Sequence, residues 1–64
     1  MNLIEGLQEE LNRCRELLQT YREIPTGGFG AAVVEQSIRE GEAAIASRDV
    51  VRMLRAYKDL QARK

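Results

Sequence analysis

The glycine-rich segment at residues 26–30 is the part of the sequence best suited to bind an anion. Backbone N–H groups at the start of a helix attract negative charge, and glycines let a ligand approach the backbone closely. No Lys-Ser or Lys-Thr pair follows the glycines, so the segment is not a P-loop. The alternative is a structural turn in which the glycines adopt positive φ and Phe29 packs at the end of the core. The candidate ligand-binding residues of this region are Arg22, Thr26, Gly27, Gly28 and Gly30.

A group of basic residues near the C-terminal end is the second candidate for binding chemistry. Arg48, Arg52 and Arg55 are spaced i, i+4 and i+7, so they share one helical face, with Lys58 adjacent to them. Guanidinium groups form paired hydrogen bonds with phosphates and carboxylates. Arg52 and Arg55 are therefore predicted to bind a nucleotide, a nucleic-acid backbone or an acidic protein surface, with Tyr57 stacking on a base. The alternative for the basic residues is that they pair with carboxylates of the preceding helices. The alternative for Tyr57 is that it lies at the edge of the core.

The sequence offers no recognisable set of catalytic or metal-binding residues. It contains no histidine and a single cysteine, which excludes the usual zinc sites and every histidine-dependent triad. Its paired carboxylates, such as Glu9 with Glu10, fall on polar helical faces, whereas general acid–base catalysis needs a perturbed group in a cleft. We therefore predict a protein that is not an enzyme, with no catalytic residues, no metal and no cofactor.

The first half of the chain carries a long apolar heptad pattern. Asn2 followed by Glu5 resembles a capping box, and the pattern begins directly after it. The pattern predicts a helix over residues 3–23 with one apolar stripe. Because this helix is longer than the others, we expect a second copy of the chain to cover part of the stripe. The predicted oligomer interface consists of Ile4, Leu7, Leu11, Cys14, Leu18 and Tyr21.

Two further helices are predicted after a break at Pro25. Proline disfavours the helical conformation of the residue before it and lacks an amide hydrogen. The second helix covers residues 29–46 and has small side chains on its apolar face, with Gly41 predicted to allow backbone contact. Asp49 is the expected N-cap of a third helix over residues 50–62. The predicted fold is all-α, one domain over residues 1–64: a helical hairpin plus a short third helix, forming a three-helix bundle.

The small size of the chain and its charges bear on its partners. Single cores below roughly 70–80 residues seldom supply more than about 3–5 kcal/mol, so we expect homo-oligomerisation to complete this one. Ten basic and ten acidic residues cancel, which makes a general nucleic-acid partner unlikely. Residues 1–47 hold four basic and eight acidic residues, a balance of −4, and residues 48–64 hold six and two, a balance of +4. The basic end is predicted either to pair with the acidic helices or to face an anionic partner.

The sequence predicts a cytoplasmic location and no contact with a membrane. No segment approaches the eighteen or so apolar residues of a membrane-spanning helix. The first ten residues lack the basic and apolar regions of a signal peptide. A lone thiol on an apolar helical face also fits the reducing cytoplasm.

Three segments of the sequence carry a resemblance to a known group of proteins. They are residues 24–31 (IPTGGFGA), 42–51 (EAAIASRDVV) and 53–57 (MLRAY). Over roughly the C-terminal two-thirds, the chain resembles small uncharacterised proteins encoded by bacteriophages and prophages of proteobacteria. The resemblance implies a bacterial host cytoplasm and an accessory protein that occupies a host factor. Arg48 stands where such proteins have glycine, a residue suited to a left-handed helix cap.

Three functions follow from these observations as expectations. The first is a non-enzymatic phage or prophage accessory protein that binds and blocks a host protein, for example a defence component. The alternative is an oligomeric sponge that sequesters a nucleotide-type messenger, with the ligand held where copies of the chain meet. The second alternative is a nucleic-acid accessory protein that uses the third helix, which the zero net charge disfavours.

Overall fold

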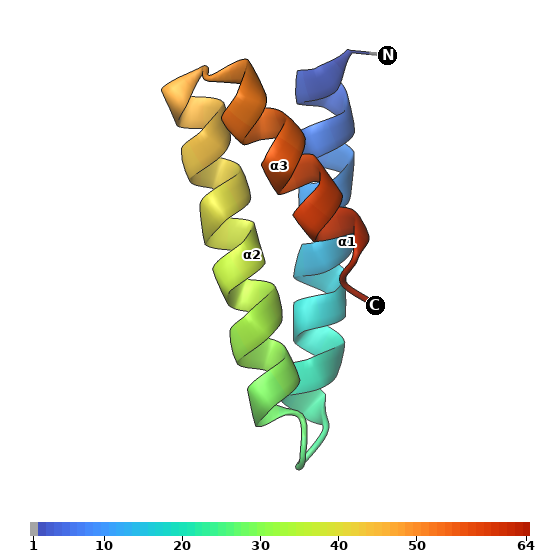
Figure 1. Ribbon diagram of the computed structural model, residues 1–64. Helices are drawn as coiled ribbons and strands as arrows, with labels where there is room; N and C mark the ends of the chain where they lie inside the picture. The colour runs from blue at the N-terminus through green and yellow to red at the C-terminus, as the bar shows by residue number, and fades with distance from the viewer. Residues whose placement is uncertain (1) are drawn as a thin grey trace.

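The computed structural model describes residues 2–64 and is composed of helices, with no β-strand in that range. The helices are α1 (Leu3–Glu23), α2 (Gly28–Ser47) and α3 (Val50–Gln61). Helices α1 and α2 form an antiparallel hairpin, and α3 turns back to lie against both (Figure 1). The predicted all-α bundle of three helices is confirmed, with observed bounds within one residue of those predicted. Oligomerisation stays a prediction.

The ends of the helices are fixed by local chemistry. Asn2 caps α1, because its Oδ1 accepts a hydrogen bond of 2.9 Å from the amide of Glu5. Asp49 caps α3 in the same way, accepting from the amides of Val51 at 3.0 Å and Arg52 at 3.2 Å. Helix α1 stops at Ile24, whose extended backbone is the conformation favoured before a proline. The boundaries are therefore encoded in residues next to them.

The glycines of the hairpin turn are needed for space rather than for positive φ. No glycine in residues 2–64 has a positive φ, so the expected left-handed glycines are wrong. A methyl group at Gly27 would lie 2.2 Å from the carbonyl oxygen of Tyr21, and one at Gly30 would lie 2.7 Å from the Tyr21 ring. Gly28 has no such neighbour within 4 Å. The turn thus packs its backbone directly against the last turn of α1.

The left-handed residue of this fold is Arg48, at the end of α2. It has φ 57° and ψ 20°, and its amide donates a hydrogen bond of 3.2 Å to the carbonyl oxygen of Ile45. A residue with a Cβ atom is strained by roughly 1–2 kcal/mol in this conformation. Glycine, which has no Cβ atom, adopts this conformation without that strain.

We expect Arg48→Gly to raise the free energy of unfolding by about 1 kcal/mol. The substitution removes the left-handed strain, and the larger entropy of unfolded glycine offsets only part of the gain. Thermal unfolding followed by circular dichroism should show a melting temperature higher by roughly 4–8 °C. Arg52→Gly, inside α3, is the matched control and should destabilise the protein by about 1 kcal/mol. Equal effects at the two positions would contradict the cap geometry.

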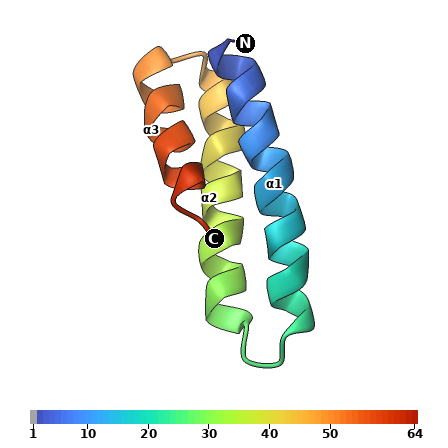
Figure 2. The same ribbon diagram turned by 90° about the vertical axis from the view of Figure 1, so that its right-hand side faces the viewer.

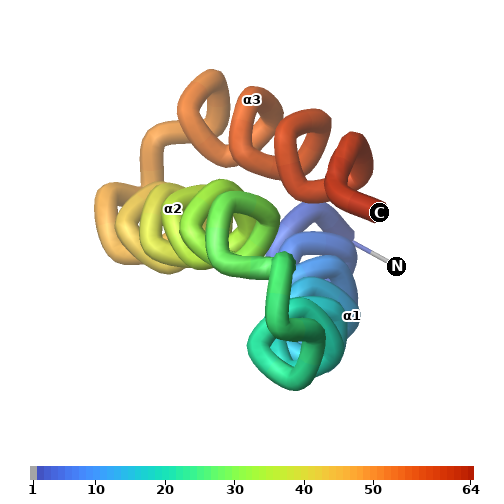
Figure 3. Tube along the Cα trace, turned by 90° about the horizontal axis from the view of Figure 1, so that it is seen from below, coloured from blue at the N-terminus to red at the C-terminus, as the bar shows by residue number. Residues whose placement is uncertain are grey.

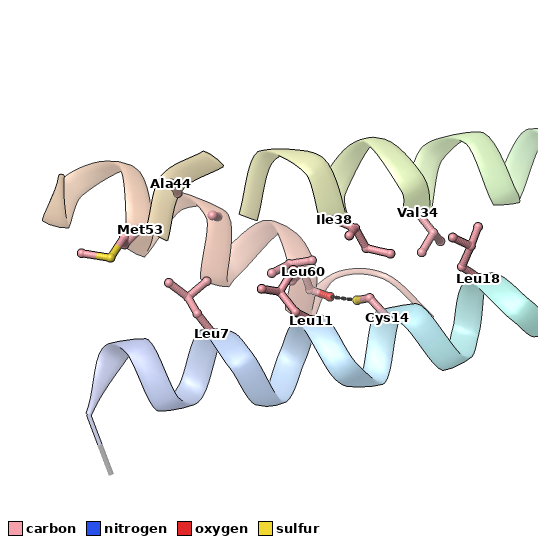
Figure 4. Packing of buried hydrophobic residues seen from close by; sticks show 10 residues of the cluster. Leu7, Leu11, Cys14, Leu18, Val34, Ile38, Ala44, Met53 and Leu60 are labelled. Carbon is pink, nitrogen blue, oxygen red and sulfur yellow. Dashed lines mark hydrogen bonds between the residues drawn. The ribbon is translucent and has the colours of Figure 1, made fainter. Parts of the chain in front are cut away.

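The core lies along the line where the helices meet (Figure 4). Helix α1 contributes four of its buried side chains, α2 three and α3 three. They are Leu7, Leu11, Cys14, Leu18, Val34, Ile38, Ala44, Met53, Ala56 and Leu60. A Cβ atom on Gly41 would stand 3.0 Å from Leu11 Cδ2 and 3.1 Å from Leu60 Cδ1. Gly41 therefore makes room for two leucine side chains, not for the backbone contact that the sequence suggested.

Cys14 is part of this core and behaves as a small apolar residue. Its Sγ lies 3.6 Å from the carbonyl oxygen of Leu60, to which the thiol donates. Burial raises the pKa of the Cys14 thiol, because the thiolate would lose its hydration. The thiol thus stays protonated at neutral pH. The free energy of unfolding is lowered by this residue only when the pH rises past the ordinary pKa of a thiol, because the unfolded chain then loses the proton first.

Helix α3 is shorter than the hairpin, and the residues after α3 continue along the hairpin (Figure 2). Arg13 donates to the carbonyl oxygens of Leu60 at 2.7 Å and Arg63 at 2.9 Å. The hydroxyl of Tyr21 donates to a backbone oxygen of Lys64 at 2.5 Å, and Arg63 Nε donates to Ser37 Oγ at 2.9 Å. These bonds hold residues 62–64 over the hairpin. None of the described helices has the length and apolar composition needed to cross a bilayer.

Candidate ligand-binding site

The residues predicted to bind a ligand do not form one site within a single chain. The turn that holds residues 26–30 lies at the opposite end of the bundle from the start of α3 (Figure 1). Arg22 is paired with Glu35 at 3.1 Å. Arg52 and Arg55 line a separate cavity of about 430 Å³, and Tyr57 lies partly buried against the core. A ligand that touched both groups would have to bridge two copies.

The predicted oligomer interface is mostly covered by the chain itself. Leu7, Leu11, Cys14 and Leu18 lie in the core between α2 and α3, so in this fold they cannot also contact a second copy. Tyr21 is partly buried there, and Ile4 keeps 43% of its surface exposed. Substitution of the central leucines by aspartate would therefore test folding rather than assembly.

The basic stripe, which we define as Arg48, Arg52, Arg55 and Lys58, faces solvent. None of its side chains has an ion pair or hydrogen bond within residues 2–64. The alternative that these cations pair with carboxylates of the first two helices is not what the structure shows. Glu35 and Glu42 pair with other arginines instead: Arg15–Glu42 at 2.8 Å, Arg22–Glu35 at 3.1 Å and Arg39–Glu35 at 2.5 Å.

The hairpin end carries a cavity that sequence analysis did not find, which we call the hairpin-end pocket. Its volume is about 280 Å³, just below the usual range of about 300–1,000 Å³ for small-molecule sites. Phe29 forms one edge and is 85% exposed, so the expectation that it packs into the core is wrong. Gly30, not Phe29, packs against the Tyr21 ring, where a Cβ atom would lie only 2.7 Å from the ring. The pocket is lined by Tyr21, Phe29, Gly30, Val33, Val34, Ala62, Arg63 and Lys64.

The hairpin-end pocket is suited to an anion, unlike two other cavities on the described part of the chain. Both of those include the carboxylates of Glu40 and Asp59, whereas the hairpin-end pocket has no acidic lining residue. Lys64 forms no ion pair with any described residue, while Arg63 pairs with Asp59 at 2.7 Å. Positive charge therefore stands beside an aromatic surface.

The start of α2 adds unpaired donors next to this pocket. Gly27 precedes the helix without any side-chain cap, and the first turn contains no acidic residue. The amide of Ala31 is the first to bond within the helix, to the carbonyl oxygen of Gly27 at 2.8 Å. The amides of residues 28–30 have no acceptor within residues 2–64. Such a helix start favours negative charge.

Several residues of this pocket could not be predicted from the sequence, because they are distant from the turn along the chain. Residues 62–64 reach Phe29 only because α3 returns along the hairpin and stops part-way. The length of α3 was the available signal, since twelve residues cover about 18 Å and the hairpin helices about 30 Å. No protein-family model, curated protein or solved structure matches this chain. The function of the pocket has to be argued from its geometry.

Proposed function

We propose that this protein is a non-enzymatic binding protein that sequesters a small anionic ligand with an aromatic base, of the nucleotide class. One observation supports this most directly. The hairpin-end pocket combines an exposed phenylalanine, a lysine side chain without an ion pair and a helix start, with no Asp or Glu among its lining residues. Each of these features matches one part of a nucleotide.

Each contact has a definite role in the proposal. A phosphate is held by the free amides of residues 28–30 and by the Lys64 ammonium group, because both carry positive charge. A base stacks on Phe29, and such stacking is worth about 1–3 kcal/mol per base. The small volume suits one nucleotide unit, so a second unit of a larger messenger extends beyond this pocket. Binding without turnover then lowers the free concentration of the messenger.

We expect Phe29→Ala to weaken nucleotide binding by about 5- to 150-fold, the equivalent of losing one stacked base. Isothermal titration calorimetry against a panel of linear and cyclic nucleotides measures the effect. Ile24→Ala is the matched control, because Ile24 is an exposed apolar residue of the same turn that does not line the pocket. Its affinity should equal that of the unmodified protein.

The two possible failures of this experiment have different meanings. Phe29 is largely exposed, so its removal should leave the circular dichroism and melting temperature unchanged. If the unmodified protein binds a nucleotide and Phe29→Ala binds it equally well, the site is elsewhere. If no nucleotide gives a heat signal, the ligand class is wrong.

Blocking of a partner protein is the second candidate function. Large apolar side chains are 43–58% exposed at the bundle end away from the hairpin turn, and exposed apolar surface favours protein contacts. A host protein captured by the unmodified chain should be lost with Val50→Glu and retained with Phe29→Ala. The opposite pattern would assign the partner to the hairpin-end pocket. The exposed residues are Ile4, Val50, Val51 and Leu54.

A further inference from the structure

The cations without an ion pair and the carboxylates without any side-chain or backbone partner lie on different helices of this molecule. The cations without an ion pair belong to α3 and the residues next to it. They are the four residues of the basic stripe and Lys64. Three carboxylates, those of Glu9, Glu16 and Glu23, have neither an ion pair nor a hydrogen bond within residues 2–64. All three are exposed and belong to α1. The charge asymmetry of the sequence is thus displayed on the surface instead of being neutralised inside the chain.

The three carboxylates form one row on the outer face of α1, which we call the acidic row. They recur every seven residues, close to two helical turns, so they project from the same face. The buried residues Leu7 and Leu11 lie on the opposite face. Fourteen residues separate Glu9 from Glu23, which gives the row a length of about 21 Å.

The outer face of α3 presents the complementary surface. Val51, Leu54, Arg55 and Lys58 follow i, i+3, i+4 and i+7 spacing, so they share one face, away from the buried Met53. Val51 is 58% and Leu54 47% exposed, which places apolar surface between the cations. Arg52 and Lys58, the first and last members of the basic stripe on α3, are six residues apart, about 9 Å along the helix, so this part fits within the length of the acidic row.

The two charged faces of one chain cannot meet each other. Viewed along the bundle, α1 and α3 occupy different corners of the triangle of helices, so their outer faces point in different directions (Figure 3). A second copy, however, supplies the acidic row that the basic stripe lacks. The zero net charge of the chain also removes long-range repulsion between copies.

We propose that the protein associates head to tail, with the basic stripe of one copy docked on the acidic row of the next. The contact is heterologous, since different surfaces of the two copies meet, and it leaves one face of each kind free at the ends. It therefore forms a closed ring or a growing chain, not a two-fold dimer. Charge pairing directs the contact, and docking covers the exposed Val51 and Leu54.

Sedimentation velocity tests the proposal through salt dependence and paired charge reversals. The unmodified protein should be larger than one copy at about 20 mM salt and should dissociate at about 500 mM, where exposed charges are screened. Arg55→Glu with Lys58→Glu removes one face, and Glu9→Arg with Glu16→Arg removes the other. Each double variant should be monomeric alone. An equimolar mixture should assemble again, because the intact basic stripe of one variant meets the intact acidic row of the other, and the two reversed faces are also of opposite charge.

A double reversal on α2, Arg39→Glu with Glu40→Arg, is the matched control and should assemble like the unmodified protein. Two results would overturn the proposal. The first is a mixture of the two variants that stays monomeric while both are folded by circular dichroism. The second is an unmodified protein that is monomeric at low salt and binds duplex DNA or anionic vesicles through Arg55 and Lys58, which would give the stripe a phosphate-bearing partner.

Discussion

Replacing Leu60 with alanine is expected to lower the free energy of unfolding by about 2–5 kcal/mol, the range for truncation of a buried leucine. Leu60 is 0% exposed and lies where the helices meet, beside Gly41 of α2 and next to Cys14 of α1. A 64-residue chain is expected to have only about 3–10 kcal/mol in total, at roughly 0.05–0.15 kcal/mol per residue. The variant should therefore lose a large part of its stability and unfold at a much lower urea concentration, as urea denaturation followed by far-UV circular dichroism will show.

The neighbouring glycine provides an internal check on this result. In the unmodified protein, a methyl group on Gly41 has to push Leu11 and Leu60 apart, because the contacts are 3.0 Å and 3.1 Å. In the Leu60→Ala background the same methyl group enters the cavity, and alanine also favours the helix by about 0.5–1 kcal/mol. The change in the free energy of unfolding caused by Gly41→Ala should thus be more favourable in the Leu60→Ala variant than in the unmodified protein. A simple sum of the two effects would show that these residues are not in contact.

Leu54→Ala is the matched control for Leu60→Ala. Both leucines belong to α3, but Leu54 is 47% exposed. Its truncation should cost about 1 kcal/mol or less, since it removes a side chain already half in water. Equal losses at the two positions would mean that α3 presents a different face to the hairpin.

Gly27→Ala is expected to destabilise the protein by about 1–3 kcal/mol or more, although it adds a single methyl group. That methyl would stand 2.2 Å from the carbonyl oxygen of Tyr21 and 3.2 Å from that of Ile24. Both neighbours are backbone atoms, so no side-chain rotation can relieve the overlap. The turn has to shift, and the hydrogen bond of 2.9 Å from Gly27 to Ile24 shifts with it.

Gly28→Ala distinguishes this clash from a general effect of losing glycine. A methyl group on Gly28 would have no neighbouring atom within 4 Å, and Gly28 begins α2 without a positive φ. Alanine there should stabilise the protein by about 0.4–1 kcal/mol, because it restricts the unfolded chain. The two variants differ by one position and should change stability in opposite directions in the same urea experiment. A loss at both would contradict the turn described here.

The sequence determined the helices and their ends, because the signals for both are local. Asn2 and Asp49 bond to amides within three residues, and Pro25 acts on the residue before it. The apolar stripe of α1 was also readable, since a period of 3.6 residues fixes which side chains share a face. Four of its six members are in the core.

Tertiary structure decided what each face contacts, which spacing along one helix cannot specify. The stripe of α1 is covered by α2 and α3 of the same chain, although the sequence was equally compatible with a second copy. The basic stripe stays in water because Glu35 and Glu42 pair with other arginines, and because the free carboxylates of α1 lie on the face opposite its buried residues. The hairpin-end pocket brings Phe29 next to Lys64 through the path of α3. Such contacts depend on relative helix lengths and packing, so only the folded chain reveals them.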